Sequence, residues 1–509
     1  MSDWSLIFLA SVVVASVYPF LWVFLVYKPR AKHYGCSAPY IDFAWPFGFF
    51  GLVRVVRGFR KHDLLQYFYH VFVDNGIKTG FQQMAGQMWL GTIEPENIKT
   101  ILATSFGDYS LGFRYDLMYT LLGDGIFTQS GAEWKHSRAL LRPQFSREQV
   151  SRLKLISGHV NLLLCHFSSG KVIDAQELYH RFTIDSATDF LFGESTHTLV
   201  PDLAEKNFVG PRGSVTGSQF ATAFTSALEI LSFRVAAGAA WFLVWTPQFW
   251  SNCQICHNFI DYFVVKTLES PDVKDAASDQ YVFIRELAKD TQDPKAIRDQ
   301  AFNILLAGRD TTASLLSFTT FYLAKFPELF NELRDVVLTE FGYDDDSATF
   351  EKLKKCKLLQ YVIKEVLRLH PVVPMNFRTA IRDTKLPKGG GISGEEPVLV
   401  MKGQNVFYST YAMQRNPAVW GPDAHQFRPQ RWFDRAGSGW EYLPFNGGPR
   451  ICLGQQFALT ETSYTIVRIC QEFTRIELVH PNTSIDTRLA EKIRLTTSMA
   501  GGIIVKFHK

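Results

Sequence analysis

The sequence has little excess charge and few cysteines. Its 53 lysine and arginine residues nearly balance 49 aspartate and glutamate residues, which leaves a formal net charge of +4. A charge this small and this mixed provides no electrostatic basis for nucleic-acid binding, so we expect no nucleic-acid partner. Seven cysteines in 509 residues do not make a disulfide scaffold, and their odd number favours a reducing compartment.

Repeats, low-complexity tracts and long joints between domains are also missing. Beyond Gly48, no proline- or glycine-rich stretch is long enough to separate two domains. No G-x-G-x-x-G motif follows a predicted strand, so the chain has no sequence signature of a flavin or nicotinamide domain. Phenylalanine, by contrast, occurs 43 times, which favours a large apolar pocket or contact with a membrane.

The first residues predict a membrane anchor. Trp4 to Tyr27 carries no charged side chain, and as a helix it would span about 36 Å, against ~30 Å of hydrocarbon. A cleaved signal peptide has a basic start and a shorter apolar run, whereas Asp3 precedes this one. Basic residues follow Tyr27 and are expected on the cytosolic side. We therefore predict a lumenal tip (1–3), a transmembrane anchor (4–27), a linker (28–50) and a cytosolic catalytic domain (51–509).

Helical periodicity dominates the remainder, and short strand-like segments lie between the helices. The predicted fold class is mainly α with minor β, built around one large domain. The longest periodic segment, Lys295 to Lys325, would cross a domain of this size. The predicted helices are Ser151–Ser168, Tyr179–Phe192, Asn258–Leu268, Lys295–Lys325, Pro327–Phe341, Lys357–Leu369 and Gln455–Phe473; the predicted strands are Gly86–Gly91, a segment ending at Val400, and Asn405–Ser409.

A glycine-rich segment before the last helix carries the clearest chemical signal. Residues 444–454 read PFNGGPRICLG and match F-x-x-G-x-R-x-C-x-G at every fixed position. Cys452 would lie just before a helix start, where amide hydrogens and the helix dipole stabilise a thiolate. Arg450 would add a positive charge, and Phe445 would shield the sulfur from water. Such a thiolate is a strong axial ligand for haem iron, so we predict haem b bound through Cys452.

Together with other motifs in the same order, this segment resembles the cytochrome P-450 superfamily of haem-thiolate monooxygenases. Glu365 and Arg368 form E-x-x-R on a predicted helix, where residues three apart share a face. Arg431, in a segment similar to the family's P-x-R-F/W, is implied to complete a buried charge triad with them. The resemblance implies the cytochrome P-450 fold, a helical bundle with small sheets around a buried haem.

The central helix contains residues 307–312, AGRDTT, which resemble the family's oxygen-binding segment. Gly308 is implied to let the helix pass close to the haem. Thr311 is implied to bond to a carbonyl one turn earlier and to deliver protons to bound oxygen, with Asp310 passing protons to it. Without the neighbouring motifs, Asp-Thr-Thr would be an ordinary polar patch on a helix.

Three further residues are implied to hold the haem propionates. Trp134 and Arg138 form W-x-x-x-R, one helical turn apart, and both would donate to a propionate. Arg378 matches a second propionate-binding arginine. Cys253-Gln254-Ile255-Cys256-His257 also matches the attachment site of c-type haem. That chemistry requires export, which the predicted topology excludes.

The resemblance from about residue 90 onward is strongest to the fungal microsomal n-alkane and fatty-acid ω-hydroxylases. It rests on segments such as LLGDGIF (121–127), LRPQF (141–145), DSATDFLFGE (185–194) and GQQFALTE (454–461). Two departures are Gln414, where this group usually has histidine, and Ala307, where animal ω-hydroxylases often carry a haem-linked glutamate. The apolar segment from Ala221 to Trp250 would either dip into the bilayer or belong to the core.

The resemblance implies a single-pass protein of the endoplasmic reticulum membrane that oxidises an apolar small molecule, in this branch the end of a long chain. Electrons would come from NADPH through a separate cytochrome P-450 reductase, docked near Lys135, Arg142 and the cysteine loop. Tailoring of a polyketide or terpenoid intermediate remains an alternative. So do a reductase-independent isomerase or peroxygenase and a non-catalytic haem-thiolate sensor. The sequence leaves the substrate identity, the site of oxidation and the oligomeric state open.

Overall fold

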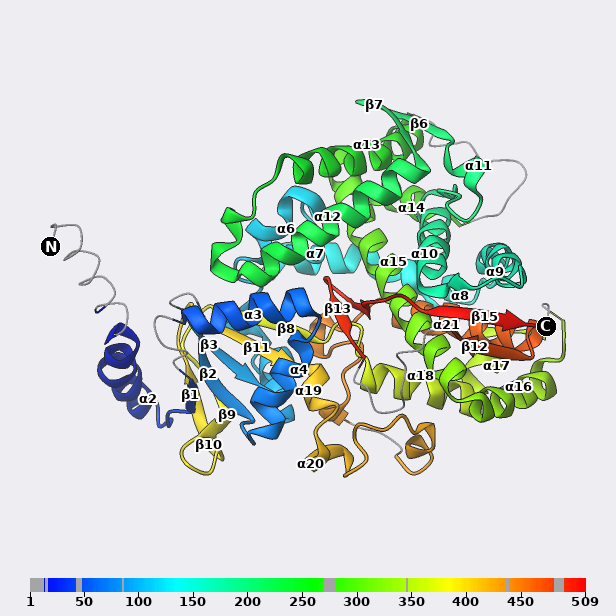
Figure 1. Cartoon of the computed structure of the whole chain (residues 1–509). Helices are drawn as coiled ribbons and strands as arrows, with labels where there is room; N and C mark the ends of the chain where they lie inside the picture. The colour runs from blue at the N-terminus through cyan, green and yellow to red at the C-terminus, as the bar shows by residue number, and fades with distance from the viewer. Residues whose placement is uncertain are drawn as a thin grey trace, which may run out of the picture.

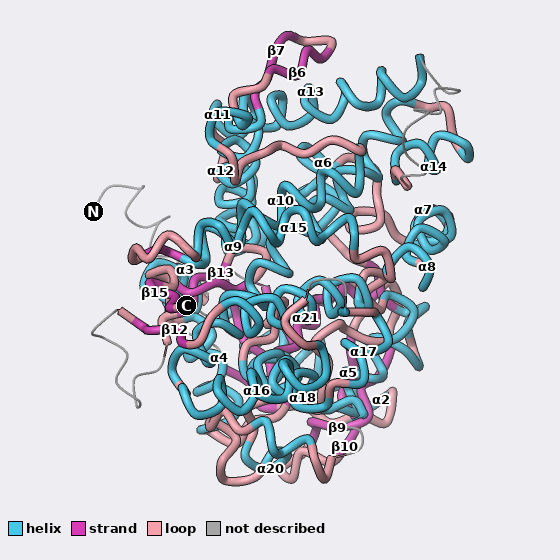
Figure 2. The backbone as a smooth tube through the Cα atoms, turned by 90° about the vertical axis from the view of Figure 1, so that its right-hand side faces the viewer, coloured by secondary structure: helices cyan, strands magenta, loops and turns pink. Residues whose placement is uncertain are grey.

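The structure is a computed structural model that describes residues 13, 17–42, 48–84, 87–269, 281–344, 347–435, 439–479 and 489–509. Helices dominate it, and several small sheets lie between them, as the sequence predicts (Figures 1 and 2). The main helices are α7 (Gly131–Leu141), α9 (Lys154–Phe167), α10 (Ala175–Phe192), α12 (Gly217–Ala237), α13 (Pro247–Glu269), α15 (Pro294–Lys325), α16 (Pro327–Phe341), α18 (Lys357–Leu369) and α21 (Gln455–Glu472).

The largest sheet joins early and late parts of the chain. Its order is β1-β2-β3-β11-β8-β4, with β1 parallel to β2, β3 parallel to β11 and the other pairs antiparallel. It lies at one side of the molecule beneath α3 (Phe49–Lys61), while the helices fill the other side (Figure 1). Its strands are β1 (Tyr40–Asp42), β2 (Thr79–Met84), β3 (Gln87–Thr92), β4 (Tyr109–Ser110), β8 (Met375–Ala380) and β11 (Asn405–Ser409).

Four smaller sheets complete the fold. The hairpin of β6 and β7 projects at the end of the molecule opposite to α20 (Pro417–Trp420) (Figure 2). The hairpin of β13 and β14 and the sheet that contains β15 bring the C-terminal segment against α10 and α15. Their strands are β5 (Ile173–Asp174), β6 (Asn207–Gly210), β7 (Gly213–Thr216), β9 (Thr384–Gly390), β10 (Glu396–Val400), β12 (Arg475–Leu478), β13 (Glu491–Ile493), β14 (Thr497–Met499) and β15 (Ile504–His508).

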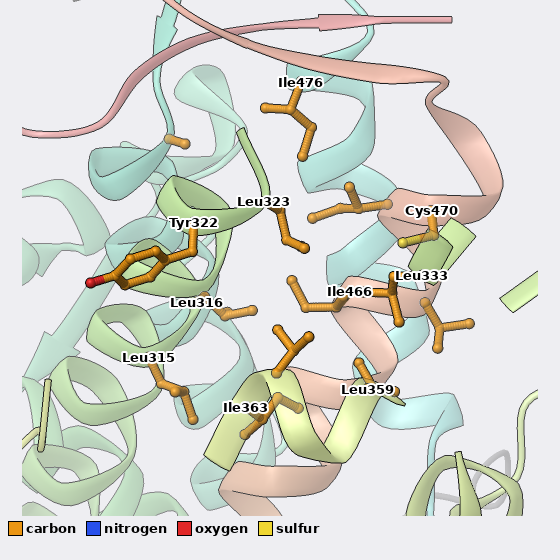
Figure 3. Close-up of a cluster of buried hydrophobic side chains, with 14 of the residues drawn as sticks. Leu315, Leu316, Tyr322, Leu323, Leu333, Leu359, Ile363, Ile466, Cys470 and Ile476 are labelled. Carbon is orange, nitrogen blue, oxygen red and sulfur yellow. The ribbon is translucent and has the colours of Figure 1, made fainter. Parts of the chain in front are cut away.

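Helix α15 runs through the middle of the molecule and is buried along nearly its whole length. It begins with Asp293, whose carboxylate accepts a hydrogen bond from the Lys295 amide at 3.0 Å, and with Pro294 in the first turn. Figure 3 shows apolar side chains of four helices meeting beside it. They are Leu316 and Leu323 of α15, Leu333 of α16, Leu359 and Ile363 of α18, and Ile466 of α21. This packing holds α15 in a fixed position relative to α21, the helix that follows Cys452.

Several helix boundaries agree with the prediction, and others extend beyond it. Helices α16 and α18 have the predicted bounds, and α15 differs by one residue. Helix α10 begins at Ala175 rather than Tyr179, because the Asp174 side chain caps it by accepting hydrogen bonds from the Gln176 and Glu177 amides. Helix α13 starts at Pro247, well before the predicted Asn258. The apolar segment around the start of α13 packs on neighbouring helices. Its sequence therefore shows no amphipathic period from which a helix could be predicted.

The predicted anchor is described only at its C-terminal end. Residues 1–12 and 14–16 lie outside the described part of the chain. Residues 17–21 are helical, and the helix continues through η1 (Trp22–Tyr27) into α2 (Lys28–His33), so it extends past the predicted end at Tyr27. Tyr27 is fully buried, and its hydroxyl donates to the Leu399 carbonyl at 3.0 Å. Strand β10, which contains Leu399, is therefore attached directly to this helix.

The segment predicted as an irregular linker, residues 28–50, contains regular elements in its described part, and residues 43–47 lie outside that part. Its first six residues belong to α2, Tyr40–Asp42 joins the large sheet as β1, and Phe49 begins α3. Among the described residues, α12 is the one helix long and apolar enough to cross a membrane, and 44% of its apolar window is buried. It packs between α13 and α3, which identifies it as part of the folded body.

Candidate functional site

The glycine-rich segment forms a tight loop directly before α21. The Cys452 amide donates to the Phe445 carbonyl at 3.1 Å, which closes the loop. Gly448 has a φ of +67°, and a Cβ there would lie 1.9 Å from the Leu102 carbonyl oxygen, so this position requires glycine. The loop places Cys452 in the wall of a cavity, together with Phe445.

Two opposing effects act on the Cys452 thiol. Burial raises its pKa, whereas the Gly454 amide and the positive charge of Arg138 lower it. The amide contribution is the one expected from a position just before a helix start. The cation, however, is Arg138 of α7, which also donates to the Ile451 carbonyl at 3.0 Å. The sequence predicts that Arg450 provides this charge, but in the structure Arg138 provides it.

Arg450 is directed toward the loop that precedes α7. Its guanidinium donates to the Ile126 and Gln129 carbonyls at 3.3 and 2.8 Å and lies 4.3 Å from the centre of the Trp134 ring. Trp134 is 4% exposed and lines the cavity between Arg450 and Arg138. The predicted pair on α7 and the arginine of the cysteine loop therefore meet at one end of the cavity.

Helix α15 forms a second wall of the same cavity. Gly308, Thr311 and Thr312 line it, and the Thr311 hydroxyl donates to the Ala307 carbonyl at 2.6 Å, as predicted for a threonine that loosens its helix. A Cβ on Gly308 would meet only Ala187, at 3.7 Å, so it would occupy open space. Apart from the two threonines, this wall is apolar.

Asp310 is not part of that wall. Its side chain is buried and turned away from the cavity, with Oδ1 3.1 Å from Arg309 and 3.6 Å from Nδ1 of His180 on α10. The residues one helical position apart, Asp310 and Thr311, therefore face different surroundings. In this geometry the carboxylate would have to swing around α15 before it could reach Thr311.

Four arginines line the cavity, and among the described residues that line it there is no aspartate or glutamate. Two of them, Arg378 on β8 and Arg114 at the start of α6 (Arg114–Leu122), each have a buried Nε without a hydrogen-bond partner among the described residues. Burial and the neighbouring arginines lower the pKa of Arg114 and of Arg450 to about 9. So many uncompensated cations at one end of a buried cavity call for an anionic ligand.

The residues around this cavity fit haem. Cys452 offers a thiolate on one wall, the glycine and threonines of α15 leave open space at another, and Arg114, Arg138 and Arg378 meet the requirement for two carboxylate groups. The predicted site residues Trp134, Arg138, Gly308, Thr311, Arg378, Phe445, Arg450 and Cys452 all line one cavity, and Asp310 is the exception.

The predicted charge triad is present and fully buried. Arg368 forms a two-pronged contact with Glu365, at 2.9 and 2.8 Å, and Arg431 donates to the same carboxylate at 3.0 Å. The Trp432 indole adds a fourth donor, at 3.0 Å. Gln414 connects this network to the cysteine loop. Its amide donates to two carbonyls at the end of α18 and accepts from the Leu443 amide at 2.7 Å, so glutamine meets the donor and acceptor needs of a position where the group usually has histidine.

The sequence model of the cytochrome P450 family matches residues 81–497. The chain belongs to this family. Cytochrome P450 52-E3 of Starmerella bombicola is 62% identical over 496 residues, covering 96% of each chain. Cytochrome P450 52E1 of Candida apicola is also 62% identical with the same coverage, and cytochrome P450 52A12 of Debaryomyces hansenii is 44% identical over 93% of this chain and 92% of its own length. The predicted superfamily, fold, haem-thiolate cofactor and monooxygenase class are thus confirmed.

Sequence reasoning missed two residues of this P450: Arg114, which lines the site, and Glu461, which lies behind Thr312 in its wall. Arg114 stands in no recognisable motif, and only the fold carries it beside Arg378. Glu461 lies nine positions after Cys452 on α21 and is fully buried, with a carboxyl oxygen 2.6 Å from the Ser186 hydroxyl and within hydrogen-bonding reach of Thr312. The sequence signal that could have identified Glu461 is its polar side chain on the inner face of a helix that is otherwise buried.

The C-x-x-C-H segment lies elsewhere in this P450. Cys253 and Cys256 are buried within α13, and His257 bonds to the Leu121 carbonyl at 2.8 Å through Nε2. None of the three lines the haem cavity. The segment is part of the packing between α13, α12 and α15.

Proposed function

We propose that this P450 hydroxylates the end of a long apolar chain at the cavity between Cys452 and Thr311. The single observation that carries the proposal is the polarity of that cavity. Its walls are mainly leucine, isoleucine, valine, alanine and phenylalanine side chains. Besides the arginines and Cys452, the polar side chains that line it are Thr311 and Thr312 of α15 and Asn376, Tyr408, Thr410 and Asn446. Such a surface favours an alkyl chain and provides few polar groups that would orient a hydrophilic molecule.

Haem held by the Cys452 thiolate would supply the activation of dioxygen. The chain's own residues have four tasks. Arg114, Arg138 and Arg378 would bind the propionates, and Trp134 would position Arg138 and Arg450 by stacking. The apolar walls would exclude water. Thr311 would hold a proton at its Oγ1, and Asp310 would replace that proton after each transfer.

We also place the substrate's access route at the membrane. Helix α3 exposes Phe49, Phe50 and Val53, and η6 (Gly238–Leu243) exposes Phe242 and Leu243. The ring centres of Phe59 on α3 and Phe233 on α12 lie 4.9 Å apart, so these apolar surfaces adjoin. Together with the predicted anchor of the endoplasmic reticulum, they would rest on the bilayer that dissolves an apolar substrate.

Electrons would come from NADPH through a separate reductase, because the sequence carries no flavin or nicotinamide motif. The exposed side chains of Lys135 and Arg142 flank Arg138, whose guanidinium contacts the cysteine loop. A positive surface beside the haem ligand suits an acidic partner, and association of that kind weakens as salt rises.

The test uses full-length protein with reductase and NADPH. Palmitate and hexadecane are supplied in turn, and the products are identified by mass spectrometry. The proposal expects alcohols at the terminal carbon. Products only at internal carbons, or no oxygenated product from either chain although NADPH is consumed, would contradict it. The Cys452→His variant should lose the strongly red-shifted absorption of the reduced carbon monoxide complex, and retention of that band would exclude Cys452 as the ligand.

A further inference from the structure

A second cavity lies on the other side of α15 from the haem pocket. Its volume is about 810 Å³, and it is open to solvent and mostly polar. It is enclosed by α10, α12, α15 and the C-terminal segment, and the residues around it include His180, Glu229, Arg309, Lys492 and Arg494. None of the haem-pocket residues described above lines it, so the two cavities are separate spaces.

Asp310 stands in the wall between these cavities. It lines neither, and its carboxylate is turned toward the polar side. His180 does line the polar cavity, and its Nδ1 is buried 3.6 Å from the Asp310 carboxylate without a hydrogen-bond partner of its own. That leaves Nε2 as the ring nitrogen available to water in the cavity. The imidazole thus stands between solvent and a buried acid.

We propose that His180 carries protons from water in this polar cavity to Asp310. The inference rests on the proposed role of Asp310 and Thr311 in proton delivery and adds the residue that supplies them. In the transfer, the Nδ1–H bond of neutral His180 breaks and an O–H bond forms on Asp310. A water molecule of the cavity gives a proton to Nε2, and the hydroxide left behind is neutralised by bulk solvent. Rotation of the ring then exposes Nδ1 to the cavity water, which gives a proton to Nδ1 and accepts the proton on Nε2, so that the starting tautomer is restored.

The charges around His180 agree with a neutral relay. Those that face it or share its cavity are Glu177 and Arg181 of α10, Glu229 of α12, Arg309 and Asp310 of α15, Lys492 of β13, and Arg494, Asp174 and Glu205. Burial and Arg309 lower the pKa of His180 to about 4, against the opposing effect of Asp310. Arg309 is itself fixed by a 2.7 Å hydrogen bond to Thr225, and Glu229 pairs with Lys492 and Arg494. A neutral imidazole can accept at one nitrogen and donate at the other, which an imidazolium cannot do.

The experiment compares four full-length variants with reductase, NADPH and palmitate. They are His180→Gln, Asp310→Asn, Thr311→Ala and His166→Gln. Glutamine keeps the volume of His180 and can donate to Asp310, but it cannot relay a proton. His166 on α9 is the matched control, because it bonds to the Leu199 carbonyl at 2.7 Å and does not line the polar cavity. Product per NADPH, hydrogen peroxide per NADPH and the solvent isotope effect in D₂O are measured for each.

We expect His180→Gln to lower product per NADPH several-fold, to raise peroxide by a matching amount and to increase the solvent isotope effect. His166→Gln should behave as the unaltered protein. Uncoupling in Asp310→Asn and Thr311→Ala but not in His180→Gln would overturn the relay and leave the proposed function intact. Coupling that persists in Thr311→Ala would instead refute the proton-delivery role in the proposed function.

A second readout needs no turnover. In the reduced carbon monoxide complex, ¹⁵N-histidine spectra should contain one histidine, absent from His180→Gln, that stays neutral with the proton on Nδ1 from pH 8 to about pH 5. A His180 signal with the proton on Nε2, or one that is already protonated at pH 6, would overturn the proposal even if the variant were uncoupled for structural reasons.

Discussion

The buried carboxyl of Glu461 makes the stability of this P450 depend on pH in an unusual direction. Burial raises the pKa of Glu461 from 4.5 to about 7, against the hydrogen bonds from Ser186 and Thr312 that lower it. Below pH 4.5 the carboxyl group is protonated in both the folded and the unfolded chain, so it does not change the free energy of unfolding. Above that pH the unfolded chain ionises first, so this residue destabilises the fold progressively until about pH 7.

The size of the effect follows from the same two values. One pKa unit between the folded and unfolded states corresponds to about 1.4 kcal/mol. The shift of Glu461 therefore costs the folded state about 3 kcal/mol once the pH is above 7. In Glu461→Gln the side chain keeps its shape and can still hydrogen-bond to Ser186, at 2.6 Å from the carboxyl in the native protein, but it cannot ionise. We expect the variant to match the native protein near pH 4.5 and to be about 3 kcal/mol more stable at pH 8.

Urea unfolding of the full-length protein in detergent, followed by tryptophan fluorescence between pH 4.5 and 8, measures this difference. Glu477→Gln is the control of opposite sign, because the pairing of Glu477 with His508 lowers its pKa on an exposed strand. A stability difference between Glu461→Gln and the native protein that does not change with pH would refute the reasoning. So would a native protein that gains stability relative to the variant as the pH rises.

Three further substitutions test the site and its support. Arg431→Ala removes one partner of the buried Glu365 carboxylate and should cost about 3–5 kcal/mol in urea unfolding; a loss below ~1 kcal/mol would show that the triad is not a buried charge network. Gly448→Ala would drive a Cβ into the Leu102 carbonyl, so we expect little haem incorporation in the carbon monoxide difference spectrum; full incorporation would contradict the need for glycine there. Thr311→Ala should keep that spectrum and still raise hydrogen peroxide per NADPH several-fold; loss of the spectrum would indicate a structural role instead.

The sequence alone was sufficient for features that depend on neighbours along the chain. The cysteine loop is one, because its glycines, Cys452 and the helix that follows form a single local unit whose backbone geometry follows from residue type. The E-x-x-R pair is another, since Glu365 and Arg368 lie one turn apart on the same helix face. The helices with clear periodicity, α15, α16, α18 and α21, were predicted within one residue at every end. In all these cases the determining contacts are short-range.

The tertiary structure decided what each side chain faces. Helical periodicity places Asp310 and Thr311 on α15, but only the packing of α10 and the C-terminal segment against that helix turns Asp310 toward His180 and a polar cavity. Arg114 reaches the haem pocket because the start of α6 lies against β8, more than 250 residues later in the chain. Burial likewise converts Glu461 from an ordinary helix residue into an acid with a pKa of about 7. Orientation, burial and electrostatic surroundings arise from contacts between distant segments, and a local sequence pattern does not determine them.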